Sequence, residues 1–171
     1  TIATTGNATS FGSLTLARYS LAGVSSGTRG VFGGGTTSSA VMDYITIATI
    51  GNATSFGNLT VSRESLAGVS SSTIGVFGGG KTTGGGAAVS AVMDYITIAT
   101  TGNATTFGNL TLARESLAGV SNGTRGVLGG GNSSSAVMDY IIVDTTGNAT
   151  SFGNLTVGRS SLSGVSSFSP S

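Results

Sequence analysis

The side chains that could do chemistry in this chain are few, and most of them recur at fixed intervals. The 171 residues include seven basic and six acidic side chains, and they include neither histidine nor cysteine. Without an imidazole or a thiolate, a nucleophile would lack its usual base, and carboxylates would have to supply both acid and base. Glu64 and Glu115 share one repeat position, where other copies carry Tyr19 and Ser160, so they read as solvated side chains. We therefore predict no enzyme activity and no cofactor.

Arginine and aspartate recur together, at Arg18, Arg63, Arg114 and Arg159 and at Asp43, Asp94 and Asp139. One interpretation is that they bind an acidic ligand or line a channel. A group present in each repeat more often serves the repeat itself, so we expect the arginines to pair with these aspartates or with turn carbonyls. Asp144 is the one aspartate outside this pattern. A calcium site there would need further acidic ligands, and these do not cluster in the sequence.

Two motifs imitate functional sites. Residues 75–82 (GVFGGGKT) fit the phosphate-loop pattern. That motif requires a following helix, but TTGGGAAVS follows, and the same glycines recur from Gly30 and Gly126 without the lysine. The glycines therefore belong to the repeat. Asn-x-Ser/Thr sequons recur in the same way, and we assign their asparagines to turns and strand ends instead of glycan attachment.

The residues that break the repeat are the remaining candidates for binding. An inserted loop spans residues 81–90, and we predict that its first residues contact a partner. A second candidate surface involves two repeat positions that vary. One carries arginine in two units and Ile74 in the unit between them, and the other carries a tyrosine in one unit only. The alternative is neutral variation. The candidate loop residues are Lys81, Thr82 and Thr83, and the candidate surface residues are Arg29, Arg125 and Tyr19.

Charge and hydropathy exclude two classes of partner. The net charge is +1 and 8% of residues are charged, so no basic patch could neutralise a series of phosphates, and we predict no nucleic-acid binding. No run of 18 apolar residues occurs, so we predict no membrane span.

The elements that position these side chains follow from an internal repeat. The segment GNAT(S/T)FG begins at Gly6, Gly51, Gly102 and Gly147, at spacings of 45, 51 and 45 residues. Each unit reads as four short strands; in the second they cover 65–71, 74–80, 92–100 and 107–114. Runs such as YITIAT carry apolar or small residues on both faces, which indicates sheets covered on both sides. We expect the turn at 101–103 to depend on positive φ at Gly102.

The order VFGGG, variable loop, VMDYITI, turn, FGNLTVSR, SLAGV resembles the kelch repeat of β-propellers. The glycine doublets at 33–34, 78–79 and 129–130, the Asp-Tyr pairs and the recurring arginines carry the resemblance. Kelch repeats usually have tryptophan where this chain has Phe11, Phe56, Phe107 and Phe152. The resemblance implies an all-β, antiparallel, kelch-like β-propeller of about four blades, with a larger ring or an open array as alternatives.

On this basis residues 1–171 form a single repeat domain. It has a half blade at 1–17, full blades at 20–62, 65–113 and 116–157, and a closing strand at 161–167 that pairs with the N-terminal hairpin. The chain also resembles kelch-like arrays of tailed bacteriophages of marine bacteria, identified as tail-fibre or virion structural proteins.

The phage resemblance implies a non-enzymatic structural or adhesive virion component. Its partners would be neighbouring virion proteins or a host-surface receptor, either protein or glycan, and it would form a homo-oligomer or part of a larger assembly. The alternative is a cellular kelch-like scaffold, extracellular or at the cell surface, that binds a protein or glycan.

Overall fold

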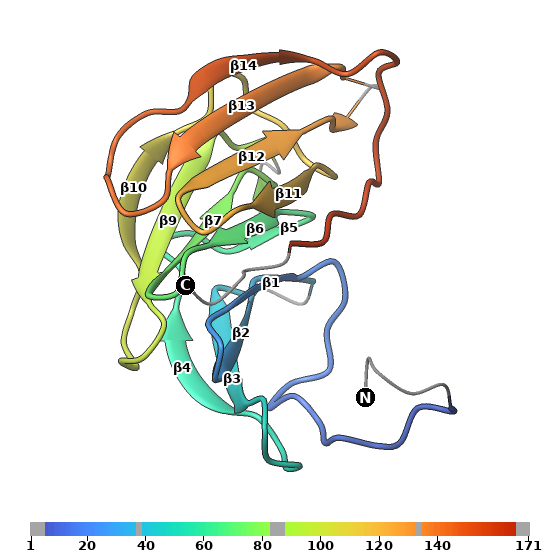
Figure 1. Ribbon diagram of the computed structural model, residues 1–171, viewed down its shortest axis with the longest axis vertical. Coiled ribbons are helices and arrows are strands. Elements are labelled where there is room, and N and C mark those ends of the chain that lie inside the picture. Colours follow the sequence, from blue (N-terminus) through green and yellow to red (C-terminus); the bar gives the residue numbers. More distant parts are fainter. Residues whose placement is uncertain (1–5, 37–38, 83–87, 133–134, 167–171) are drawn as a thin grey trace.

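The computed structural model describes residues 6–36, 39–82, 88–132 and 135–166, which form antiparallel β-sheets without an α-helix. Three sheets have four strands each, in simple sequential order (Figure 1). The first contains β1 (Ala22–Ser25), β2 (Arg29–Gly33), β3 (Val41–Thr46) and β4 (Thr54–Asn58). The second contains β6 (Ala67–Ser70), β7 (Ile74–Gly78), β9 (Val92–Thr97) and β10 (Thr105–Asn109), and the third contains β11 (Ala118–Ser121), β12 (Arg125–Gly129), β13 (Val137–Ile142) and β14 (Thr150–Asn154).

A β-bulge in each outermost strand turns a phenylalanine out of the ladder. In the first sheet Met42 pairs with Gly57 and Asp43 pairs with Ser55, so Phe56 between them has no partner on β3. The second and third sheets repeat this register shift around Phe107 and Phe152. The freed phenylalanine ring packs edge-on against a tyrosine of the third strand, with centroids 6.0–6.1 Å apart. Bulges of this kind re-aim a side chain without ending the sheet.

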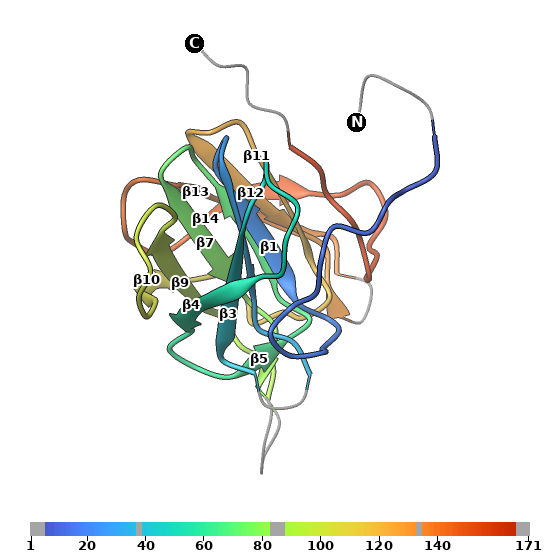
Figure 2. The ribbon, with the colours of Figure 1, turned by 90° about the horizontal axis from the view of Figure 1, so that it is seen from below.

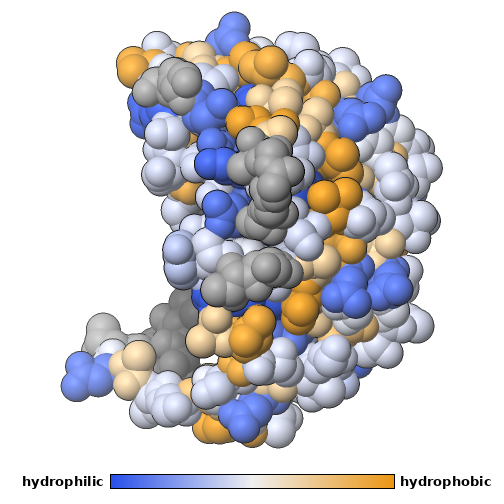
Figure 3. Space-filling view, turned by 180° about the vertical axis from the view of Figure 1, so that it is seen from behind, coloured by the Kyte–Doolittle hydropathy of each residue, from blue (hydrophilic) through white to orange (hydrophobic). Residues whose placement is uncertain are grey.

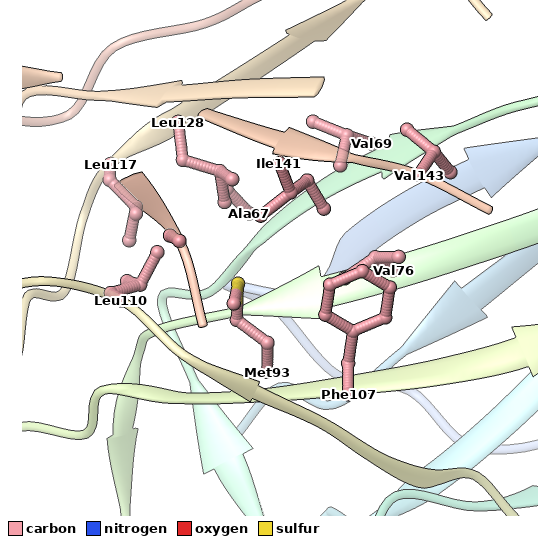
Figure 4. Packing of buried hydrophobic residues seen from close by; sticks show 11 residues of the cluster. Ala67, Val69, Val76, Met93, Phe107, Leu110, Leu117, Leu128, Ile141 and Val143 are labelled. Atoms are coloured by element: carbon pink, nitrogen blue, oxygen red, sulfur yellow. The ribbon is translucent and has the colours of Figure 1, made fainter. Parts of the chain in front are cut away.

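Two hydrophobic cores lie between successive sheets. The core between the second and third sheets joins Val69, Met93 and Phe107 to Leu128 and Ile141 (Figure 4). The core between the first and second sheets joins the equivalent residues one unit earlier. The second sheet is thus covered on both faces, as its lack of polar alternation predicts.

The first strands of the three sheets lie side by side and approach each other at glycines. A Cβ atom added to Gly68 would lie 2.3 Å from the carbonyl oxygen of Gly23, and one added to Gly119 would lie 2.4 Å from that of Gly68. Residues 161–166 continue the series beside β11, with Gly164 as close to Gly119. Backbone hydrogen bonds fix this stacking, from the N–H groups of Ser65, Ser116 and Ser161 to the carbonyls of Ser20, Ser65 and Ser116.

The sheets form an open arc. Figure 3 shows the molecule hollowed on one side. Figures 1 and 2 show the described blue and red ends of the chain on one side of the molecule, and Figure 1 shows them apart from one another. The three predicted full units each contain one sheet. The described residues of the predicted N-terminal half unit, 6–17, contain no strand, and neither do 161–166 of the predicted closing strand.

The difference at the C-terminus has a physical reason. In the complete units the first strand pairs with a second strand of sequence RGVFG, IGVFG or RGVLG. After Ser166 the sequence reads SFSPS, in which proline cannot donate to a ladder. Residues 161–166 therefore stack on β11 without a ladder partner among the described residues.

Two further details differ from the sequence-based expectations. Gly102 does not have positive φ; the constraint lies instead at Gly57, where φ is +153° and an added Cβ would lie 2.1 Å from the Gly102 carbonyl oxygen. A small extra sheet pairs β5 (Arg63–Glu64) with β8 (Lys81–Thr82) at the inserted loop. Among the described residues there is no helix with the length and apolarity that a membrane span requires.

We predict that Gly68→Ala destabilises the protein, because the new methyl group meets the Gly23 backbone and the first two sheets must separate. Such overpacking costs about 1–3 kcal/mol. Gly23→Ala is the matched control, since its Cβ would meet only the Phe32 ring, at 3.7 Å. Denaturant unfolding measures both variants; equal losses would contradict the close-approach explanation.

Candidate functional site

The recurring arginines are buried ion-pair partners. Arg63 lies in β5, in the segment that leads from the first sheet to the second, and its Nη2 lies 2.6 Å from Oδ2 of Asp94 on β9. Equivalent pairs join Arg18 to Asp43 and Arg114 to Asp139, at 2.7 and 2.5 Å. All six side chains are fully buried. The predicted arginine–aspartate pairing is confirmed for these three arginines.

Each pair is the centre of a larger hydrogen-bond network. Nη1 of Arg63 donates to the carbonyls of Gly79 and Val92, at 2.5 and 2.6 Å, while the Thr60 hydroxyl donates to Oδ1 of Asp94. Burial lowers the pKa of Arg63 below its ordinary value, and the Asp94 carboxylate opposes that shift. These groups are therefore committed to each other and are closed to an acidic ligand.

The threonine of this network was not anticipated from the sequence. Thr15, Thr60 and Thr111 each donate to the aspartate that the arginine also binds. The signal in the sequence is their fixed position, three residues before Arg18, Arg63 and Arg114. Arg159 has the same place in the repeat, but it is exposed, and its Nε donates to the nearby Val157 carbonyl.

The candidate binding-loop residues lie where the inserted loop leaves the sheet. Lys81 lies opposite Glu64 in the β5–β8 pair, and the Thr82 hydroxyl bonds the backbone of Ala88. Thr83 lies outside the described residues. Tyr19 is at the same end of the molecule, because its carbonyl accepts a hydrogen bond from the Thr36 amide in the corresponding loop of the first sheet. Its side chain is 70% exposed.

The other candidates lie at the opposite end of the sheets. Arg29 begins β2, next to the β1–β2 turn, and its guanidinium lies over the Tyr44 ring at 4.3 Å. Its Nη1 also donates to the carbonyls of Ile98 and Ala99 in the turn after β9, at 3.0 and 2.9 Å. Arg125 lies over Tyr140 at 5.0 Å, at the same end. The structure therefore does not bring Arg29 and Arg125 together with Tyr19 and Lys81.

Two residues that depart from the repeat, Ile74 and Asp144, lie at the interface between the second and third sheets. Ile74 takes the place of Arg29 in the second sheet and packs against the core. Asp144, in the turn between β13 and β14, accepts a hydrogen bond from the Ser71 hydroxyl at 2.8 Å. Asp144 thus links the second and third sheets where the first and second are linked by Arg29.

The glycine triplet that imitates a phosphate loop is committed to the scaffold. The Gly79 amide donates to the Val92 carbonyl and the Gly80 amide donates to the Arg114 carbonyl. Lys81, which follows, begins a strand and not a helix. These two amides therefore cannot turn toward a phosphate without breaking the sheet contacts.

A cavity of about 350 Å³ lies along the first strands. Its lining is mostly glycine and serine, including Gly68, Ser70 and Ser121, and contains no ionisable side chain among the described residues. The serines are already engaged: the Ser70 hydroxyl donates to the Ser25 carbonyl, and that of Ser121 donates to the Ser70 carbonyl. The cavity offers apolar surface and hydrogen-bonding groups but no acid or base.

Among the described residues, no three histidine, cysteine, aspartate or glutamate side chains lie close enough to hold a metal ion. Neither a protein-family model nor a curated protein matches the sequence. The interpretation of the site therefore rests on its geometry.

We predict that Arg63→Ala strongly destabilises the protein, because Asp94 keeps a buried charge without its partner. Breaking a buried ion pair in this way costs about 3–5 kcal/mol. Arg159→Ala is the matched control at the same repeat position, where the side chain is exposed, and we expect a change within about 0.5 kcal/mol. Chemical denaturation measures both; an Arg63→Ala variant as stable as Arg159→Ala would show that the network does not support the fold.

Proposed function

We propose that the three sheets are consecutive blades of a kelch-like β-propeller and that the chain is a non-enzymatic structural or adhesive module of a virion. The arrangement of the first strands around a common cavity supports the propeller interpretation, as does the coverage of the second sheet on both faces. The arc would then be part of a ring or of a longer array.

One observation carries the functional part of this proposal. The aspartates of the repeat and three of its arginines are buried in the framework, whereas side chains that differ between units are accessible at the loop end. A rigid sheet scaffold that presents variable loop residues is the usual design of a binding module. Tyr19 and Lys81 occupy that end, with Glu64 beside Lys81.

The virion setting rests on the resemblance to phage tail-fibre arrays. In that setting the loop end contacts either a neighbouring virion protein or a host-surface protein or glycan. Antibodies against the chain should label the tail or surface of assembled particles in electron micrographs. Labelling of cell surfaces without particles would favour the cellular scaffold instead.

We predict that the double variant Tyr19→Ala/Lys81→Ala loses adhesion while keeping its stability, because it removes an exposed aromatic and a cation at the loop end. The measurement is binding of labelled protein to bacterial cells and to arrayed surface glycans, with a thermal melt of the same samples. We expect at least a tenfold loss of binding.

Ile50→Thr is the control for this experiment. Ile50 is 72% exposed at the opposite end, and the other units carry threonine there. Its binding should equal that of the unchanged protein. Equal binding by the loop-end variant and the control would reject the loop end as the adhesive surface.

A further inference from the structure

Successive repeat units are joined by a small contact that occurs three times among the described residues. Residues Gly102–Ala104, in the β9–β10 turn, lie along the outer edge of β4 in the preceding sheet. The Gly102 amide donates to the Phe56 carbonyl, and the Ala104 amide donates to the Asn58 carbonyl, both at 2.8 Å. The Asn58 amide donates to Oδ1 of Asn103 at 3.0 Å. We call residues 102–104 a clasp.

The same three hydrogen bonds recur on either side. The clasp Gly147–Ala149 binds Phe107 and Asn109 at the edge of β10, and the clasp Gly51–Ala53 binds Phe11 and Ser13 in the N-terminal segment. On β4 and β10 the clasp covers a strand edge that would otherwise present free backbone groups.

Covering the edge also completes the burial of the outer strand. Phe56 and Phe107, on strands that carry a clasp, are each 4% exposed. Phe152, at the same position on β14, is 47% exposed. On the same face Val120 is 41% exposed, whereas its equivalents Val24 and Val69 are 5% and 3% exposed. The third sheet therefore has the surface of an interface without its partner.

The chain also contains a fourth copy of the clasp sequence, Gly6–Ala8. Its three residues are exposed, and no hydrogen bond joins them to the rest of the described chain. Figure 1 places this segment at the opposite end of the arc from β14. One end of the molecule thus carries a free clasp and the other carries a free clasp-binding edge.

The free edge has room for the missing clasp. Where clasps are bound, a Cβ added to Gly57 or Gly108 would lie 2.1 Å from the carbonyl oxygen of the clasp glycine. A Cβ added to Gly153 on β14 would meet nothing within 4 Å. The space that a clasp carbonyl fills at β4 and β10 is therefore open at β14.

We propose that the occupant of this edge is a second copy of the chain, which binds β14 through its own Gly6–Ala8 clasp. The Gly6 amide would donate to the Phe152 carbonyl, the Ala8 amide to the Asn154 carbonyl, and Oδ1 of Asn7 would accept from the Asn154 amide. Because the two halves of the contact are different surfaces, the association is head-to-tail, and it closes into a ring or continues as a filament. This inference concerns assembly and does not depend on what the loop end binds.

The test measures molar mass by light scattering after size-exclusion chromatography. The unchanged chain should elute with at least twice its 16.6 kDa mass. Gly6→Pro/Asn7→Ala removes a donor and an acceptor from the clasp, and Phe152→Asp places a charge in the interface; each variant should elute as a monomer. Leu112→Ala changes an exposed side chain outside any clasp contact, so it is the control and should assemble normally.

Mixing the two defective variants tests the head-to-tail geometry. The clasp variant keeps an intact edge and the Phe152→Asp variant keeps an intact clasp, so an equimolar mixture should recover one junction and form a dimer. Thermal melts establish that each variant is folded. A monomeric unchanged chain at all concentrations, or a mixture that stays monomeric, would overturn the proposal, and neither result would bear on the adhesion experiment.

Discussion

The buried arginine–aspartate pair is the interaction on which the rest of this structure depends. Removing a guanidinium and a carboxylate from water costs several kcal/mol for each ion, and their mutual attraction and hydrogen bonds must offset this cost. The Nη atoms of Arg63 bind Asp94 and two backbone carbonyls, and Thr60 binds the second carboxylate oxygen, while the buried Nε of Arg63 has no hydrogen-bond partner among the described residues. Since these groups come from the linker, the second-strand loop and the third strand, the pair holds three chain segments in one relative position.

The second constraint on the fold is the small size of the residues in the first strands, because it sets how closely neighbouring units approach. The glycines of the first strands bring neighbouring backbones into contact, and the serines beside them bond from one strand to the next. Thin layers of Val, Met and Leu then suffice to fill the space between sheets. A core of this kind has little tolerance for added volume at the axis, whereas the outer loops can vary, as the six-residue insertion of the second unit illustrates.

These two constraints explain why the repeat offers so little chemistry. Its aspartates and most of its arginines are used in the networks, and its sequon asparagines at 52, 103 and 148 accept backbone hydrogen bonds between successive units. Two complementary surfaces, the Gly6–Ala8 clasp and the edge of β14, are not used within the described chain. We therefore assign binding to the residues that depart from the repeat, and assembly to the two ends of the arc.

The all-β class, the four strands of each complete unit and the pairing of arginine with aspartate could be predicted from the sequence, because each depends on a pattern that recurs with the repeat. The separation of Tyr19 and Lys81 from Arg29 and Arg125 was decided by the tertiary structure, since strand direction places them at opposite ends. The tertiary structure also decided that glycine is required at Gly57 and not at Gly102, because the Gly102 backbone of the next unit leaves no room for a side chain at Gly57. The expected closing sheet depended on contacts between distant ends of the chain, which the local patterns of 1–17 and 161–167 could not fix.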